Sequence, residues 1–426
     1  MLAAPNKVGS LLDRLDRARA QTDKLFEIVR PDSLYDRPIP ERHRIVFYIG
    51  HLEAFDWNLL RSESSLRPFD ADLDRLFAFG IDPVDGGLPS DHPSDWPVLE
   101  QVRRYGARVR DALQSVSSFS EILLNTAIEH RLMHAETLAY MFHRLPLDKK
   151  IRQPQAGVPE REPPLSESIE IPDGCVTLGL CRDAADFGWD NEYDAHTVRV
   201  PAFAIDRYKV TNGQYLEFLQ AEGYRDRSLW TAADWEWKSA SGISHPVFWK
   251  RAGDAWHLRT MFDEISLPPS WPVYVSQAEA SAYARRAGKR LPTEPEWQRA
   301  AYGSNDGRFP WGDQRPDPEH GYFDFERWDP APVDAFPQGR SAFGLDGLLA
   351  NGWEWTATPF GPFEGFQAVP FYEGYSANFF DGKHFVMKGG SPRTDRSMLR
   401  RSFRNWFQPH YPYVYAGFRC ASNGSK

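Results

Sequence analysis

The amino-acid sequence changes character near residue 150, and this change restricts the chain to folds with two different parts. Residues 8–30, 41–62 and 97–145 carry apolar side chains at the spacing of an α-helix, with little glycine or proline. Residues 63–96 interrupt this pattern with proline and glycine, so we expect a long loop there. The pattern predicts a helical bundle over residues 1–151.

The segment that follows is polar and rich in proline. We interpret residues 152–172 as a linker. From residue 173 to residue 426, short β-like runs alternate with turns and with two helical stretches, 211–221 and 276–287. We therefore expect an α+β chain, in which the bundle precedes an irregular domain whose long loops carry function.

Composition excludes several classes of function. The net charge of −9 does not suit a nucleic-acid-binding protein, because such proteins usually display a basic face. Three irregularly spaced cysteines, Cys175, Cys181 and Cys420, suit neither a disulfide framework nor a zinc ribbon. No apolar run resembles a signal peptide or reaches the roughly 20 residues of a membrane span. We expect a reducing, cytoplasmic setting without a membrane partner.

A pair of histidines gives the strongest chemical signal. His130 and His134 lie one turn apart, about 5.4 Å, on the same face of an expected helix, so both imidazoles can bind one metal ion. His51 lies in the other strongly apolar helix and is the best third ligand. Three protein ligands leave open positions for substrate and oxygen, and imidazole suits iron, zinc, copper and nickel. Alternatively, the histidines are buried structural residues.

At these histidines the chain resembles a known family. The pattern His-x-x-x-His-x-Glu at 130–136, with Gly50-His51 upstream, resembles the DinB-like domain of the sulfoxide synthases of ergothioneine and ovothiol biosynthesis. The second part resembles the formylglycine-generating-enzyme-like domain that is fused to it in that family. The segments that carry this second resemblance are FGWDNEY at 187–193, YKVTNGQY at 208–215, RLPTEPEW at 290–297, NGWEW at 351–355, KGGS at 388–391 and AGFRC at 416–420.

The resemblance implies a non-haem iron(II) enzyme that uses O2 to join a thiol sulfur to the imidazole of hercynine, giving a sulfoxide. His51, His130 and His134 would hold the iron, where oxygen and the thiol bind, while the second domain holds the imidazole substrate. A metal favours the thiolate form of a bound thiol. Asn405 and Trp406 match the family's Asn-Trp pair, which contacts the carboxylate and ammonium region of hercynine. A tryptophan face suits a quaternary ammonium, and an asparagine amide can donate to a carboxylate.

Substrate-binding positions depart from the family's pattern. Met133 stands where the family has a glutamine that contacts hercynine, and Phe407 stands where it has an aspartate for γ-glutamylcysteine. Residues 408–413 lack the arginine that accompanies this aspartate. The charged groups for a γ-glutamyl dipeptide are thus missing, so we expect free cysteine as the sulfur donor. Arg61 of the helical part could substitute for the missing charge.

The family's catalytic tyrosine has no direct counterpart, because residues 379–383 read FFDGK. A proton donor is still required. We consider Tyr372 and Tyr375, which lie nearby in the sequence, and Tyr48 on the metal-bearing helix.

Asn351 and Glu354 resemble a structural calcium position of the second domain. The alternative is a buried turn before Trp355.

Several alternatives concern the function. Residues 77–82 and 379–384 and the Glu129-His130 pair look closer to the ovothiol branch, which acts on histidine itself. A selenium compound could replace the thiol. A zinc-dependent thiol transferase and a non-catalytic binding module are further alternatives. Formylglycine generation is not expected, because the sequence around residues 391–393 has no cysteine pair.

Overall fold

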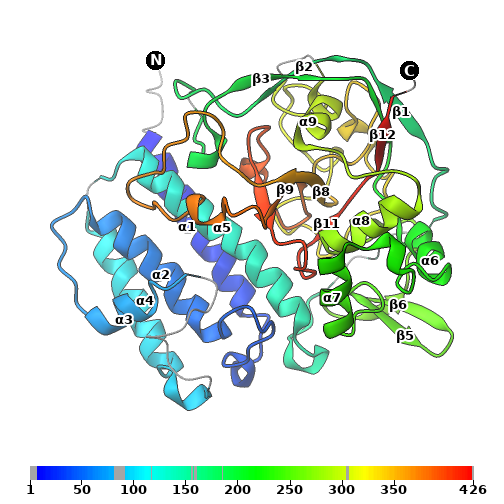
Figure 1. Cartoon of the computed structure of the whole chain (residues 1–426). Helices are drawn as coiled ribbons and strands as arrows, with labels where there is room; N and C mark the ends of the chain where they lie inside the picture. Colours follow the sequence, from blue (N-terminus) through cyan, green and yellow to red (C-terminus); the bar gives the residue numbers. More distant parts are fainter. Residues whose placement is uncertain are drawn as a thin grey trace. The chain divides into compact units, whose positions relative to one another are not determined.

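The computed structural model describes residues 7–80, 92–116, 118–154, 157, 161–184, 186–303 and 307–424. The chain divides into two compact units, Met1–Pro154 and Gln155–Lys426, which are drawn in Figure 1 and are considered one at a time below. No described helix combines the length and the apolar character that crossing a membrane requires.

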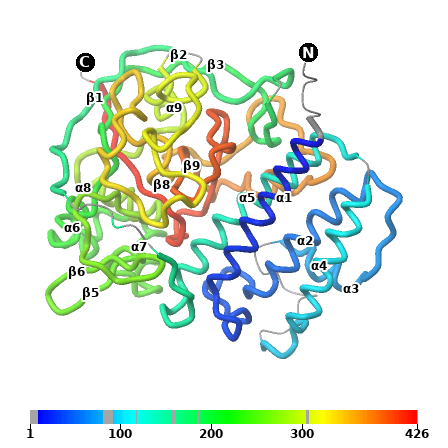
Figure 2. The backbone as a smooth tube through the Cα atoms, turned by 180° about the vertical axis from the view of Figure 1, so that it is seen from behind, coloured from blue at the N-terminus to red at the C-terminus, as the bar shows by residue number. Residues whose placement is uncertain are grey.

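The first unit consists of α-helices that pack along their lengths. Within the described residues these are α1 (Lys7–Phe26), α2 (Ile45–Arg61), α3 (Ala71–Leu76), α4 (Leu99–Gln114) and α5 (Glu121–Arg144). Helices α1 and α5 lie side by side, and α2 packs against both α4 and α5 (Figures 1 and 2). Helix α5 is buried on most of its surface. Its leucine, alanine and aromatic side chains lie on most sides of the helix, as expected for a helix inside a bundle.

The helical character predicted for the N-terminal part is confirmed. The loop expected over residues 63–96 is wrong in part, because α3 lies within it. This helix begins after Asp70, whose side chain accepts a hydrogen bond from the amide of Leu73 at 3.1 Å. Such a cap satisfies an amide that the helix leaves free, but the signal is weak among prolines and glycines. Residues 81–91 lie outside the described residues.

The second unit combines small sheets with short helices. Its described strands are β1 (Ser168–Ile171), β2 (Gly174–Leu178), β3 (His196–Val200), β4 (Phe203–Asp206), β5 (Trp249–Ala252), β6 (Ala255–Arg259), β7 (Glu264–Ser266), β8 (Gly352–Pro359), β9 (Phe385–Gly390), β10 (Asn405–Phe407), β11 (Ala416–Gly417) and β12 (Ala421–Asn423). Its described helices are α6 (Asn212–Gln220), α7 (Ala232–Ala240), α8 (Gln277–Arg286) and α9 (Glu294–Tyr302). The mixed α+β class predicted from the sequence is confirmed.

The sheet that positions the candidate site has the order β10-β9-β8-β11. Strand β9 pairs antiparallel with both β8 and β10, whereas β11 pairs parallel with β8. Strands β10 and β11 therefore form its two edges. Helix α9 packs beside this sheet and contributes Trp297 to a core that also contains Phe323, Leu345 and Leu348.

The segment expected as a linker is partly a strand. Residues 168–171 form β1, which pairs antiparallel with β4, so the last residues of the expected linker belong to a sheet. The helical stretches expected at 211–221 and 276–287 correspond to α6 and α8.

Two helices of the second unit, α7 and α9, were not expected from the sequence. Helix α9 begins with a capping box, in which the side chains of Thr293 and Glu296 each bind the other residue's backbone amide. The sequence TEPE therefore contains the signal for this helix.

Candidate functional site

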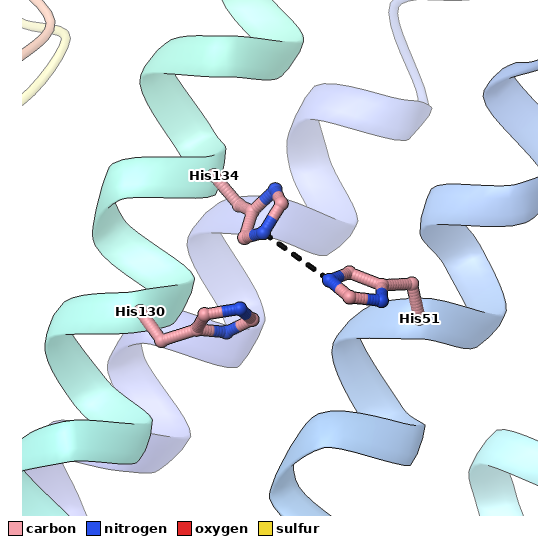
Figure 3. A group of neighbouring side chains, drawn as sticks. All are labelled: His51, His130 and His134. Carbon is pink, nitrogen blue, oxygen red and sulfur yellow. Dashed lines mark hydrogen bonds between the residues drawn. The ribbon is translucent and has the colours of Figure 1, made fainter. Parts of the chain in front are cut away.

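Three histidines meet inside the first unit. His51 projects from α2, and His130 and His134 project from α5 toward it (Figure 3). Their exposed fractions are 5%, 3% and 5%, and one nitrogen of each lies within 4.8 Å of the others. The Nε2 atoms of His51 and His134 are 3.3 Å apart. The antiparallel packing of two helices thus brings together side chains that are 83 positions apart in the sequence.

The cluster suits a metal ion. Nitrogens that bind one ion at about 2.1 Å lie no more than about 4.2 Å apart, so the 3.3 Å separation fits directly and the widest one, up to 4.8 Å, needs a small rotamer adjustment. Burial lowers the pKa of His51 to about 4 and also lowers the pKa values of His130 and His134. The imidazoles are therefore neutral at physiological pH, as metal ligands must be.

The orientation of His51 is set by a backbone carbonyl. Its Nδ1 donates a hydrogen bond to the carbonyl oxygen of Phe77 at 2.7 Å. This bond places the proton on Nδ1 and leaves the lone pair of Nε2 facing the other histidines. The ring of Phe77 packs against Gly50, where a Cβ atom would come within 2.4 Å of it. Phe77 was not among the expected site residues.

Aromatic rings hold two of the imidazoles in place. Phe47, one turn before His51, stacks on it with centroids 5.1 Å apart, and Phe55 stacks on His130 at 3.4 Å. Such stacking limits the rotation of the two imidazole rings.

A buried ion network lies directly beside the cluster. Arg131, which is 1% exposed, donates through Nη2 to the carbonyl oxygen of Leu52 and to Asp56, both at 2.8 Å. It also pairs with Glu53 at 3.1 Å, and Arg19 of α1 pairs with Asp56 at 3.0 Å. The network therefore joins α1, α2 and α5 at the level of the histidines. Charged residues within otherwise apolar helices could have indicated this network from the sequence.

Two other expected residues of this unit lie near the histidines. Tyr48 is fully buried, and its ring centroid is 5.9 Å from that of His134 and 6.4 Å from that of His51. Met133 directly precedes His134 on α5 and is half-buried. Tyr48 thus belongs to the surroundings of the cluster, and a methionine at this position cannot make the hydrogen bonds of an amide.

In the second unit, Trp406 lies in an aromatic platform. It occupies the edge strand β10 opposite Val386 of β9. Its ring stacks on Phe360 with centroids 4.2 Å apart and an angle of 6°, and it meets Tyr375 edge-on at 5.4 Å. Phe379 lies 5.6 Å away. The structure therefore brings Tyr375 and the Phe379 position together with Trp406.

The tyrosines expected as proton donors are neighbours. The rings of Tyr372 and Tyr375 are 5.6 Å apart, and Tyr375 stacks on Trp189 at 3.9 Å. Burial raises the pKa of Tyr372 above its usual value, so its phenol remains protonated at neutral pH. Trp189, from the FGWDNEY segment, supports this pair.

The residues that flank Trp406 are also fixed. The Oδ1 atom of Asn405 accepts a hydrogen bond from the amide of Trp406 at 2.9 Å, and this bond does not use the Nδ2 donors of Asn405. Arg404 is held by both oxygens of Glu294, at 2.9 and 3.1 Å. Phe407 stacks on Tyr411 with centroids 5.2 Å apart. Phe407, which stands where the family has an aspartate, therefore packs against a second aromatic ring.

The expectation of calcium at Glu354 is wrong. Both carboxylate oxygens accept hydrogen bonds from Arg419, at 2.7 and 2.8 Å, and one also pairs with Lys209 at 3.0 Å. The side chain of Asn351 exchanges hydrogen bonds with the backbone of Ala331. Two cations already neutralise the carboxylate, so it is not available as a ligand. Its buried ion pairs instead join β8 to the C-terminal segment.

Comparison with known proteins identifies close relatives. The model of the sulfatase-modifying factor enzyme 1-like domain matches residues 154–424. A protein of Mycolicibacterium smegmatis named hercynine oxygenase is 34% identical, over 97% of this chain and 98% of its own length. The hercynine oxygenase of Mycobacterium tuberculosis is 42% identical, over 56% of this chain and 57% of its own length. Ergothioneine biosynthesis protein 1 of Neurospora crassa is 27% identical over 92% of this chain, which matches 55% of that relative.

Proposed function

Because this chain belongs to the sulfoxide synthases of ergothioneine biosynthesis, whose second domain is sulfatase-modifying factor enzyme 1-like, we propose that it is a hercynine oxygenase. In the proposed reaction, O2 is the oxidant. It accepts the electrons that are released when a thiol sulfur bonds to an imidazole carbon of hercynine and is oxidised to a sulfoxide. One oxygen atom becomes the sulfoxide oxygen. The other leaves as water together with the hydrogens of the thiol and of the ring carbon.

The three buried histidines support this proposal most directly. Their neutral imidazoles, whose Nε2 atoms are 3.3 Å apart in the pair of His51 and His134, can hold one iron(II) ion. When bound, iron(II) supplies the electron-transfer chemistry that activates oxygen, and it favours the thiolate form of the sulfur substrate. The stacked Phe47 and Phe55 keep water away from the ligand set, and the carbonyl of Phe77 keeps Nε2 of His51 available to the metal.

The aromatic platform of the second unit suits hercynine better than histidine. Hercynine carries a quaternary ammonium, which is attracted to the face of a tryptophan. We propose that Trp406 contacts this group and that the Nδ2 donors of Asn405 bind the carboxylate. Met133 stays a predicted substrate-binding residue, and a methionine side chain can contribute only apolar contact.

We propose that Tyr375, or its neighbour Tyr372, donates a proton during the reaction. Tyr375 is in ring contact with Trp406 and is fixed by its stack on Trp189. A phenol near a bound imidazole can donate a proton without carrying a charge beforehand. Tyr375→Phe should therefore lower kcat. It should leave the KM of hercynine within about twofold, because the phenylalanine ring keeps the contacts of the tyrosine ring. An unchanged kcat would assign the role to Tyr372, which Tyr372→Phe tests in the same way.

The function is tested with the iron-loaded protein, hercynine and cysteine. We expect mass spectrometry to show a sulfoxide whose oxygen derives from 18O2, with equimolar oxygen consumption. Replacing His51, His130 or His134 with alanine should remove bound iron and abolish oxygen uptake. His143→Ala is a matched control, because His143 lies on the same helix α5, is equally buried and is not in the cluster.

Full iron occupancy in all three histidine variants would refute the metal site. Turnover of histidine in preference to hercynine would instead assign the chain to the histidine-specific chemistry, with the same metal.

A further inference from the structure

Arg131 joins the two helices that carry the three histidines, and it does so at the level of the histidines themselves. It directly follows His130 on α5. Its Nη2 atom donates a hydrogen bond at 2.8 Å to the carbonyl oxygen of Leu52, which is the residue after His51 on α2. The residue next to one expected ligand therefore binds the backbone next to another.

The same side chain holds α2 at two levels along its axis. Its Nη2 atom also donates to Asp56 at 2.8 Å, one helical turn after Leu52. Its Nη1 atom lies 3.1 Å from Glu53 and donates to the hydroxyl of Thr22 on α1 at 3.3 Å. A carboxylate can follow a moving guanidinium by changing its rotamer, but the carbonyl of Leu52 moves only with the helix. These contacts therefore oppose both sliding and rotation of α2 against α5.

A metal site that draws its ligands from two helices tolerates little sliding between them. Moving one helix along its axis by a single residue displaces its side chains by about 1.5 Å, whereas metal–ligand distances vary by only about 0.2 Å. The register of α2 and α5 must therefore be set precisely for His51 to reach the same ion as His130 and His134.

Apolar packing alone sets such a register poorly. Leucine and alanine side chains can interdigitate in more than one register, whereas a buried guanidinium has few acceptable partners. A buried ionic group often adds little net stability compared with apolar residues of the same size, and its best-attested role is to fix register. Arg131 is 1% exposed, so a shift of α2 would leave buried donors without acceptors.

The charge of Arg131 acts in the opposite direction to this positional effect. Burial is the largest cause that lowers the pKa values of His51, His130 and His134, and the charge of Arg131 lowers all three further. A charge that disfavours a proton on these rings also disfavours a metal cation there. If Arg131 acted through its charge alone, its removal would tighten metal binding. If it acts by position, its removal weakens metal binding.

We propose that Arg131 is a positioning residue for the metal, because it holds the backbone beside His51 in register with the two histidines of α5. This inference rests on the metal site of the proposed function. It adds a residue that acts on the site through the helices and through no contact with the metal or a substrate.

Titration of the metal-free full chain with cobalt(II), followed by visible absorption, tests this role without turnover. Arg131→Met should weaken cobalt(II) binding by about 10- to 100-fold, as is typical when a group that orients metal ligands is lost. Arg131→Lys keeps the charge but cannot bind Leu52 and Asp56 together through a planar fork, so it should weaken binding by about tenfold.

Arg19→Met is the matched control. Arg19 is also buried and pairs with the same Asp56, but within the described residues it makes no hydrogen bond to the backbone of α2. Its replacement should destabilise the bundle and change the cobalt(II) affinity by less than about threefold. Urea unfolding of each variant shows how much stability is lost, so that a loss of affinity confined to the Arg131 variants is not explained by instability.

The outcomes separate this inference from the proposed reaction. Unchanged or tighter cobalt(II) binding in the Arg131 variants would overturn the positioning role, and so would an equal loss in Arg19→Met. If Arg131→Met does not fold, Arg131→Lys decides, because it keeps the buried charge. Failure of the wild-type protein to bind cobalt(II) would contradict the metal site and the role of Arg131 with it. Weaker binding in the variants of a protein that forms no sulfoxide would support Arg131 and contradict the proposed reaction.

Discussion

At the scale of single residues, the two nitrogens of His51 are kept for different purposes. Nδ1 is bound to the carbonyl of Phe77, and Nε2 faces His134. The sequence predicted the pairing of His130 with His134, because residues one turn apart share a helix face. It did not predict Phe77, because every residue has a carbonyl and only the folded chain shows which carbonyl meets the imidazole.

Trp406 should decide which imidazole substrate is preferred. A cation–π contact contributes about 0.5–2 kcal/mol, so Trp406→Ala should raise the KM of hercynine by about two- to thirtyfold. The KM of histidine, which has no quaternary ammonium, and that of the thiol should change less. Steady-state kinetics with each substrate varied in turn provide the measurement.

Trp406→Phe is the matched variant, because it keeps an aromatic face against Phe360 and should keep most of the preference for hercynine. A rise confined to the KM of the thiol would show that this ring faces the other substrate.

At the scale of secondary-structure elements, charge as well as apolar packing joins α2 to α5. Arg131 reaches residues 79 and 75 positions earlier, Leu52 and Asp56. Helical periodicity predicted both helices, but it could not show which buried charges meet. Short elements were harder to predict: α3 depends on one cap at Asp70, and β1 is a four-residue strand at the end of a proline-rich segment.

Removing Arg131 should destabilise the helical unit strongly. Arg131→Met leaves Glu53 and Asp56 buried with fewer partners, and breaking a buried ion pair in this way costs about 3–5 kcal/mol. Urea unfolding followed by circular dichroism measures the free energy of unfolding. Arg75→Met is the control, because the exposed pair of Arg75 with Asp72 should contribute no more than about 1 kcal/mol. Equal stability of the two variants would contradict the structural role of the network.

At the scale of the whole molecule, the sequence was sufficient for the order and class of the two parts. Helical spacing before residue 150 and dense turns after it depend only on local pattern. The prediction of calcium at Glu354 was wrong because it depended on a contact between residues that are distant in the sequence. The motif NGWEW contains a carboxylate, but it does not show that Arg419, 65 positions later, occupies both oxygens of Glu354.

The choice of sulfur donor follows from the charges that the whole chain offers. The γ-glutamyl group of γ-glutamylcysteine brings a carboxylate and an ammonium group of its own, and its amide bond makes the amino group of cysteine neutral. Desolvating these two charged groups is costly unless paired groups meet them, and Phe407 in its stack with Tyr411 offers none. Since a charge-assisted contact contributes about 1.5–3 kcal/mol, free cysteine should exceed γ-glutamylcysteine by about tenfold or more in kcat/KM. Mass spectrometry of products from equal concentrations of both thiols measures this ratio. Predominant incorporation of the dipeptide would mean that another cation, such as Arg61, replaces the missing arginine, and Arg61→Met should then restore the preference for cysteine.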